Sequence, residues 1–245
     1  MEILRRLRAA HAIVQPDAFA VARVRCPFCG PSLLVRLSHD EHGIRCVRCG
    51  ASAIHLSMGG ALNTHVPDLA RRDAYELSAR GPLVAHLRRV ACALTVSEYL
   101  PEANSRGGVR SEDVQGLTFA DASFDLVTHT EVLEHVPDDA RAFSELHRVL
   151  RPGGIMLFTV PQHGGERTVE RARLRNGTIE HLLTPAFHRD PLRGGVGILA
   201  YRDYGRDILG RLRAAGFDTP EFHDPPSLAP WYVSRTVIIA RKADS

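Results

Sequence analysis

Four of the five cysteines are arranged in two pairs that have the spacing of a metal site. The pairs are Cys26–Cys29 and Cys46–Cys49; each has a gap of two residues and is followed by glycine, and sixteen residues separate the pairs. A two-residue gap lets both thiolates face one ion at tetrahedral angles, and the glycine lets the turn close tightly. We therefore predict one structural Zn²⁺ ion held by Cys26, Cys29, Cys46 and Cys49.

The segment between the cysteine pairs is typical of a zinc ribbon. Short strands are predicted at Leu33–Leu37 and near Ile44, and a segment this short needs metal binding to supply its folding energy. Two disulfides are the alternative, but they are disfavoured because charged residues interrupt any signal-peptide core in residues 1–22. For the same reason we expect a cytoplasmic protein. Cys92 lies in an apolar run and is predicted to be a buried core thiol.

A second cluster of reactive side chains lies at Glu131, Glu134 and His135, within five residues of the chain. His135 suits a general base because imidazole titrates near neutral pH, and Glu131 is the other candidate catalytic residue. Two carboxylates and an imidazole are also adequate ligands for a divalent metal ion. A third interpretation is structural, with Glu134 and His135 capping and bracing a loop.

The elements around this cluster predict a strand, a helix and a second strand. Phe124–Val127 is a short apolar run, and Pro137-Asp138-Asp139 opens a helix whose apolar residues recur at helical spacing. Pro152-Gly153-Gly154 ends the helix, and Ile155–Val160 is predicted to be a buried strand. This order and length form a βαβ unit of a parallel sheet.

This block resembles the middle of the class I S-adenosylmethionine-dependent methyltransferases of the type 11 family. The resemblance rests on Phe-Asp-Leu-Val at 124–127, Glu-Val-Leu-Glu-His-Val at 131–136 and Arg-Val-Leu-Arg-Pro-Gly-Gly at 148–154, and it covers roughly residues 75–241. It implies a Rossmann-like, doubly wound α/β domain with a seven-stranded sheet at residues 70–245, after an amino-terminal segment with the zinc ribbon at residues 1–57. It also implies that S-adenosylmethionine is the cofactor.

The resemblance assigns the first cofactor contacts to the turn after the first strand of the sheet. Glu76 occupies the position of the family's acid, but Ser78, Arg80 and Pro82 stand where the family has glycines, and Gly81 is one place off. A subset of the family with a cysteine-pair module has a similar Glu-x-Ser-x-Arg-Gly turn, which favours retained binding. Ser78 then offers a hydroxyl, and Arg80 pairs with the cofactor's carboxylate in bidentate fashion. The alternative is a degraded turn in a non-enzymatic relative.

Further cofactor contacts are implied at the ends of later strands. Glu98 ends the predicted strand Leu94–Tyr99, where the family binds the ribose hydroxyls, and Tyr99 is included beside it. Asp113 matches the residue that accepts a hydrogen bond from the adenine amino group, and Val114 is expected to pack beside the ring. His129 completes the set of expected cofactor contacts.

Two features remain on the substrate side. The similar Glu-x-x-Glu-His segment of ubiquinone-biosynthesis O-methyltransferases and small-RNA end methyltransferases binds a divalent metal, so the resemblance also implies a second metal at Glu131, Glu134 and His135. Residues 178–197 form a long insertion rich in His, Arg and Gly. We predict that this insertion is a loop over the active site that includes His181 and His188.

Composition sets the remaining limits. The net charge of +3 over 245 residues is too small to indicate a nucleic-acid partner, and no apolar stretch reaches the length of a membrane span. The sequence therefore favours methyl transfer to an oxygen or nitrogen of a small-molecule substrate. A catalytically silent cofactor-binding or adaptor protein is the alternative, and a zinc-ribbon modifier of nucleic acids is a third hypothesis. The acceptor and the oligomeric state are not predicted.

Overall fold

The computed structural model describes residues 15–40, 43–100, 105–189 and 197–244, so most of the expectation about residues 1–22 falls outside the described residues. The chain divides into two compact units, and each is assembled from separate stretches of sequence. Unit 1 consists of Met1–Arg71, Arg80–Ala91 and His223–Val237, and unit 2 consists of Arg72–Ala79, Cys92–Phe222 and Ile238–Ser245.

Unit 1 contains the predicted zinc ribbon. Strands β1 (Ala20–Cys26), β2 (Gly30–Arg36) and β3 (Ile44–Cys46) form an antiparallel sheet in that order, after a short 3₁₀ helix η1 (Pro16–Ala18). The β1–β2 hairpin closes at Cys26 opposite Gly30, and Leu34 on β2 is opposite Cys46 on β3. This register places both cysteine pairs at the same end of the ribbon.

Two helices of unit 1 pack with the ribbon and with residues 223–237. Helix α3 (Pro82–Val90) contributes His86, whose ring stacks on Phe28 at 4.7 Å, and Arg89, which donates to the Phe28 carbonyl. Helix α2 (Ala53–His65) contributes Ser57, whose hydroxyl lies 3.0 Å from that of Tyr232. The two units divide the chain at other positions than the predicted domains, residues 1–57 and 70–245. The boundaries of those two domains stay a prediction.

Helix α2 was not predicted from the sequence, because Gly59 and Gly60 interrupt its centre and glycine is a poor helix former. The structure gives the reason for the first of these glycines. A Cβ atom at Gly59 would lie 2.5 Å from the Phe28 ring, so the helix approaches the ribbon at the one residue type that permits it. A short 3₁₀ helix, η3 (Leu69–Arg71), follows α2.

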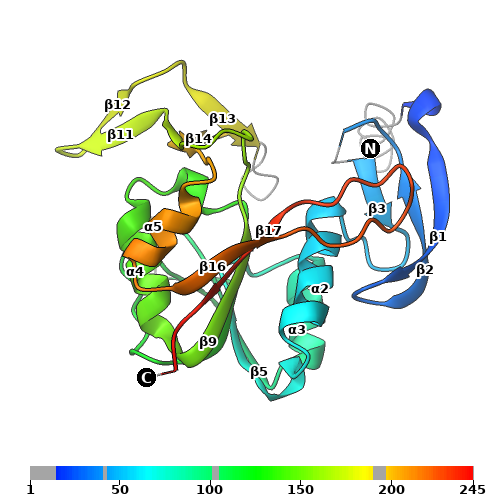
Figure 1. Cartoon of the computed structure of the whole chain (residues 1–245), viewed down its shortest axis with the longest axis horizontal. Coiled ribbons are helices and arrows are strands. Elements are labelled where there is room, and N and C mark those ends of the chain that lie inside the picture. The colour runs from blue at the N-terminus through cyan, green and yellow to red at the C-terminus, as the bar shows by residue number, and fades with distance from the viewer. Residues whose placement is uncertain (1–14, 41–42, 101–104, 190–196, 245) are drawn as a thin grey trace. The chain divides into compact units, whose positions relative to one another are not determined.

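Unit 2 is built on a mostly parallel sheet, which confirms the predicted fold class (Figure 1). Its strand order is β16-β17-β9-β8-β4-β5-β7-β6. Neighbouring strands from β9 to β7 are parallel, and β17 is antiparallel to β9. The bounds are β4 (Asp73–Glu76), β5 (Ala93–Glu98), β6 (Ser105–Arg106), β7 (Val109–Ser111), β8 (Phe124–Thr130), β9 (Leu150–Thr159), β16 (Asp218–His223) and β17 (Val237–Arg241).

Within the described residues, this sheet has eight strands rather than the seven predicted. The extra strand is β6, which pairs antiparallel with β7 because Gly107 and Gly108 take positive φ angles of 58° and 79° and turn the chain back. The expected buried strand at 155–160 is also longer, since β9 starts at Leu150, directly after the preceding helix.

Helices α4 (Asp139–Val149) and α5 (Ile208–Ala214) belong to unit 2 and lie side by side (Figure 1). Asp138 caps α4 by accepting a hydrogen bond of 3.0 Å from the Arg141 amide. The apolar face of α4 is buried through Ala142, Phe143, Leu146 and Val149. No helix in the described part of the chain is long and apolar enough to cross a membrane.

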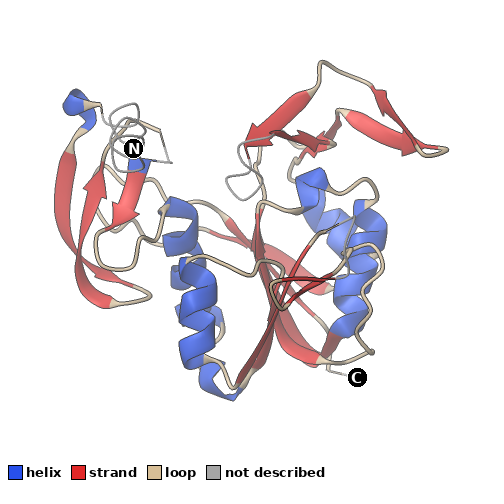
Figure 2. Cartoon of the chain, turned by 180° about the vertical axis from the view of Figure 1, so that it is seen from behind, coloured by secondary structure: helices blue, strands red, loops and turns tan. Residues whose placement is uncertain are grey.

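The insertion between β9 and α5 forms short strands where a loop was predicted. Figure 2 shows these strands gathered beyond one end of the sheet of unit 2. They pair as antiparallel hairpins, β11 with β12 and β13 with β14, and β10 pairs with β15. Their bounds are β10 (Val169–Glu170), β11 (Ala172–Arg175), β12 (Thr178–His181), β13 (Ala186–Arg189), β14 (Gly197–Ala200) and β15 (Arg202–Asp203). The prediction that Cys92 is buried was wrong, because it lies exposed in the bend before β5.

Candidate functional site

Three predicted cofactor residues follow neighbouring parallel strands of unit 2. Glu76 ends β4, Glu98 ends β5, and Asp113 comes two residues after β7. Carboxyl ends of parallel strands meet at one edge of a sheet, which is where ligands bind in open α/β folds. Hydrogen bonds join these ends: the Ala79 amide donates to Glu98 Oε1 at 2.9 Å, and the Glu112 amide donates to the Glu98 carbonyl at 3.0 Å.

Glu76 is the most deeply buried of these acids, at 2% exposure. Its carboxylate accepts hydrogen bonds from the Thr128 hydroxyl and the Ser78 amide. Burial outweighs these bonds and, together with the negative charge of Glu98, raises the pKa of Glu76 to about 8. The carboxyl group is therefore mostly protonated at neutral pH, and a nearby cation would favour its ionised form.

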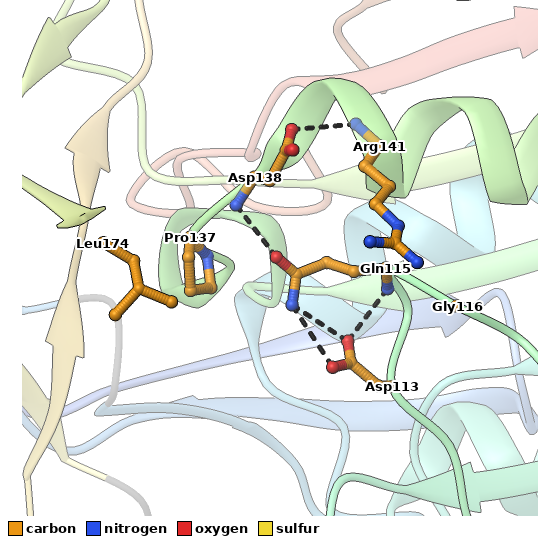
Figure 3. A pocket seen from close by; sticks show the side chains of 7 residues that line it. All are labelled: Asp113, Gln115, Gly116, Pro137, Asp138, Arg141 and Leu174. Carbon is orange, nitrogen blue, oxygen red and sulfur yellow. Dashed lines mark hydrogen bonds between the residues drawn. The ribbon is translucent and has the colours of Figure 1, made fainter. Parts of the chain in front are cut away.

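Asp113 lines a pocket of about 430 Å³ at this edge of the sheet (Figure 3). Its carboxylate accepts from the Gln115 amide at 2.9 Å and from the Gln115 side chain at 3.1 Å. The side-chain oxygen of Gln115 in turn accepts from the Asp138 amide at 3.0 Å. Of the predicted cofactor residues, only Asp113 lines the pocket; Val114 beside it is buried at 8% exposure.

The turn between β4 and α3 requires glycine at one position, Gly81, which is one place away from the positions where the resemblance expects glycines. Gly81 has a φ of +108°, which side chains rarely adopt, and Pro82 occupies the first turn of α3. Ser78 is half-buried and Arg80 is exposed. The backbone therefore places its one left-handed residue at Gly81, and the neighbouring positions tolerate side chains.

His129 and Tyr99 have opposite environments. His129 is fully buried, its ring stacks on Phe158 at 4.7 Å, and burial lowers its pKa to about 3. Neither ring nitrogen has a hydrogen-bond partner among the described residues. Tyr99 is 51% exposed. Both remain predicted cofactor contacts.

The acid and histidine cluster follows β8 at the same edge of the sheet. Glu131 is the first residue after the strand and has a φ of +52°, a strained conformation for a residue with a side chain. Glu134 and His135 follow in a 3₁₀ helix, η4 (Leu133–His135). Backbone strain at a strand end is a feature of functional sites, so the loop is a candidate for more than bracing.

In the structure, His188 on β13 lies beside Glu134 and His135. Glu134 Oε1 lies 3.6 Å from His135 Nε2 and 3.7 Å from His188 Nδ1, and the two rings are T-shaped with centroids 4.9 Å apart. The carboxylate of Glu134 raises the pKa of His188. His135 Nδ1 donates a hydrogen bond to the Leu199 carbonyl at 2.8 Å, so in the neutral ring the tautomer is the one with its proton on Nδ1.

A buried arginine fixes this loop. Arg202, at 3% exposure, donates to the carbonyls of Leu133, Val136 and Pro137 at 3.2, 2.6 and 2.8 Å. Its charge is balanced by Glu170 at 3.1 Å. The sequence did not predict a role for Arg202. The structure shows that its guanidinium group satisfies the backbone acceptors around Glu134 and His135.

The four predicted zinc ligands of unit 1 form a separate cluster. All four sulfur atoms lie within 4.8 Å of one another, with Cys26–Cys49 at 3.7 Å and Cys29–Cys46 at 3.6 Å. These separations are too long for disulfides and match the roughly 3.8 Å expected between sulfurs at 2.3 Å around a tetrahedral ion. Burial and neighbouring thiols raise the pKa of Cys29 to about 11, whereas the burial of Cys46 is outweighed by hydrogen bonds from Ser32 and from backbone amides, which lower its pKa to about 6. The cluster fits Zn²⁺.

The fold of unit 2 is that of the class I methyltransferases. A solved 1,6-didemethyltoxoflavin N1-methyltransferase of Burkholderia thailandensis, with bound 1,6-didemethyltoxoflavin and S-adenosylhomocysteine, has a TM-score of 0.50 at 21% identity and covers 77% of this chain and 79% of its own. A family model described as a methyltransferase domain matches residues 78–158 of this chain. The chain is thus similar to S-adenosylmethionine-dependent methyltransferases in the fold of unit 2 and in the sequence of residues 78–158.

Curated relatives match over shorter segments. A probable S-adenosylmethionine-dependent methyltransferase of Mycolicibacterium smegmatis is 43% identical over 56 residues, which are 23% of this chain and 22% of that protein. Phthiotriol/phenolphthiotriol dimycocerosates methyltransferase 1 of Mycobacterium ulcerans is 33% identical over 82 residues, which are 34% of this chain and 30% of that protein. The chain therefore spans less than a third of the length of these relatives.

Proposed function

We propose that this protein transfers a methyl group from S-adenosylmethionine to an oxygen or nitrogen atom of a small molecule. In the reaction, the acceptor's lone pair attacks the methyl carbon, and the carbon–sulfur bond breaks with its electrons passing to the sulfonium. The products are the methylated acceptor and S-adenosylhomocysteine. Catalysis comes mainly from positioning, and Glu131 or His135 takes the acceptor's proton where one must leave.

One observation supports this proposal most directly. Glu76, Glu98 and Asp113 follow three neighbouring parallel strands. Glu98 and Asp113 lie within residues 78–158, which match the methyltransferase domain, and Glu76 lies just before them. We assign Glu98 to the ribose hydroxyls and Asp113, with Val114, to the adenine. Glu76 and Ser78 face the methionine part, and Arg80 pairs with its carboxylate. Zn²⁺ at the cysteine cluster is structural, and the cytoplasmic location stays a prediction.

Calorimetry with S-adenosylmethionine and S-adenosylhomocysteine tests the proposal. Replacing Glu98 or Asp113 by alanine should weaken both ligands by about 1–3 kcal/mol, the cost of losing a charged acceptor of hydrogen bonds from the ligand. Glu221→Ala is the matched control, since Glu221 is an exposed acid of β16. Unchanged affinity in both site variants would place the cofactor elsewhere.

The silent-protein alternative is favoured by the missing glycines of the turn. Only Gly81 in this turn has a positive φ, so the backbone does not need glycine at positions 78 and 80. This observation weakens the silent-protein alternative. Wild-type protein that binds neither cofactor form would support the alternative. Binding without turnover of any acceptor would support a cofactor-binding or adaptor role.

A further inference from the structure

His55 lies against the turn that the proposed function assigns to the methionine part of the cofactor. A Cβ atom at Gly81 would lie 3.5 Å from His55 Nε2, so this nitrogen faces the side of the turn that glycine leaves open. His55 is in the first turn of α2, and Gly81 is the N-cap residue of α3. Both residues belong to unit 1, as does Arg80. A ring nitrogen from another helix therefore lies beside the residues that are assigned to the cofactor.

The other ring nitrogen of His55 is held by the start of α2. His55 is the N3 residue of a capping box, in which its Nδ1 accepts a hydrogen bond of 3.4 Å from the Ser52 amide and lies 2.6 Å from the Ser52 hydroxyl. Because Nδ1 is an acceptor, the neutral ring carries its proton on Nε2. Burial, together with the positive charge of Arg45, lowers the pKa of His55 to about 4, so the ring is neutral at pH 7. His55 thus presents an N–H donor to the turn.

The zinc ribbon holds this donor in place. The two helices that carry His55 and Gly81 both pack on Phe28 of the ribbon. A Cβ atom at Gly59 of α2 would lie 2.5 Å from the Phe28 ring, and His86 of α3 stacks on the same ring at 4.7 Å. The position of Nε2 against the turn is therefore set by packing within unit 1. A donor that is positioned before the ligand arrives binds it at a lower entropic cost.

We infer that His55 is a further cofactor-binding residue, whose Nε2–H donates a hydrogen bond to the carboxylate of S-adenosylmethionine beside Arg80. The inference rests on the proposed function. An N–H donor suits the carboxylate, because the ammonium and sulfonium groups of the same part of the cofactor are cationic. The ribose and the adenine are assigned to Glu98 and Asp113. A hydrogen bond to a charged acceptor is worth more than one between neutral groups. The helix that follows the ribbon then supplies part of the cofactor site.

Two substitutions at position 55 separate ligand binding from helix capping. Glutamine and glutamate both serve at the N3 position of a capping box, so His55→Gln and His55→Glu should keep the start of α2 intact. Glutamine offers an N–H donor to a carboxylate, whereas glutamate offers a negative charge and no donor. Asn63→Ala is the control, since Asn63 is an exposed residue of the same helix.

Calorimetry on the zinc-loaded, full-length protein measures the effect, with S-adenosylhomocysteine and adenosine as probes. S-adenosylhomocysteine keeps the carboxylate and adenosine has none. We expect S-adenosylhomocysteine to bind His55→Gln within about threefold of the wild-type affinity and His55→Glu at least about tenfold more weakly. Adenosine should bind both variants and Asn63→Ala like the wild type. If His55→Glu does not fold, His55→Ala takes its place, because it also lacks the donor.

A loss of affinity that is confined to S-adenosylhomocysteine and restored by glutamine supports the inference. Equal affinity of the glutamine and glutamate variants overturns it, because residue 55 then only caps α2. Equal losses for the two ligands also overturn it, since the substitution then disturbs the fold of the turn. A wild type that binds neither ligand refutes the proposed function together with the inference. A wild type and a His55→Glu variant that bind S-adenosylhomocysteine equally well refute the inference alone.

Discussion

Replacing Glu76 by glutamine should change how the stability of the protein depends on pH. The pKa of Glu76 rises from its ordinary 4.5 to about 8 in the folded chain, chiefly because the group is buried. Between these values the folded state holds a proton that the unfolded state has released. Stability is therefore highest below pH 4.5, falls as pH rises through this window, and has lost the whole contribution above pH 8.

The size of the effect follows from the same two values. A rise of roughly 3.5 in pKa corresponds to at most about 5 kcal/mol, or about 1.4 kcal/mol for each pH unit inside the window. Glutamine resembles the protonated acid and does not titrate. The free energy of unfolding of Glu76→Gln minus that of the wild type should thus grow by about 4 kcal/mol between pH 5 and pH 8.

Urea unfolding followed by far-ultraviolet circular dichroism at several pH values measures this difference. Glu221→Gln, on the exposed side of β16, controls for loss of a glutamate in general. Parallel profiles for the wild type and Glu76→Gln would refute the reasoning, because Glu76 would then be ionised and hydrated in the folded state. A cationic cofactor beside Glu76 should also release a proton at pH 7, which calorimetry in buffers of different ionisation enthalpy detects.

Three further predictions concern the metal, the turn and the loop. Cys46→Ser should lower the zinc content below one equivalent. It should also speed hydrogen exchange in α3 as well as in the ribbon, because α3 packs on Phe28. Faster exchange in the ribbon alone would contradict this prediction. Arg80→Ala should weaken the binding of S-adenosylmethionine by about 1.5–3 kcal/mol but leave the binding of adenosine, which has no carboxylate, unchanged. Arg80→Lys should retain part of the lost affinity. Equal losses of affinity for both ligands would indicate a misfolded turn. Arg202→Met should destabilise the protein by about 3–5 kcal/mol, because three carbonyls around η4 lose their donor, whereas Glu170 keeps Arg211 as a partner at 2.9 Å. An unchanged melting temperature would show that water replaces the guanidinium group.

The sequence predicted the parts of the fold in which neighbouring residues decide the structure. The apolar run at Phe124–Val127 and the capped helix after Asp138 appear as β8 and α4, and the cysteine spacing appears as the ribbon. In these segments the local pattern and the tertiary packing favour the same element. The prediction failed where packing overrides the pattern, as at Gly59 in α2.

The site shows the same limit. The strand-end acids were predictable because a parallel sheet brings its carboxyl ends together. The pairing of Glu134 with His188 was not, since 53 residues separate them, including helix α4, strand β9 and the β11–β12 hairpin. His188 was expected near the active site, but only the β13–β14 register and the Leu199 contact show which groups it faces.

Unit 1 is assembled from three separate stretches of the chain, which limits how proteolysis and genetic recombination can separate it from unit 2. Residues 80–91 and 223–237 belong with the ribbon, yet the chain reaches them only after passing through unit 2. A protease that cuts once between the ribbon and β4 would release an incomplete body. A single genetic crossover at that point would likewise join a ribbon to helices that evolved with another one. We therefore expect the ribbon and the methyltransferase sheet to be transplanted only as one piece, and chimaeras between relatives to fold only when all three stretches come from the same parent.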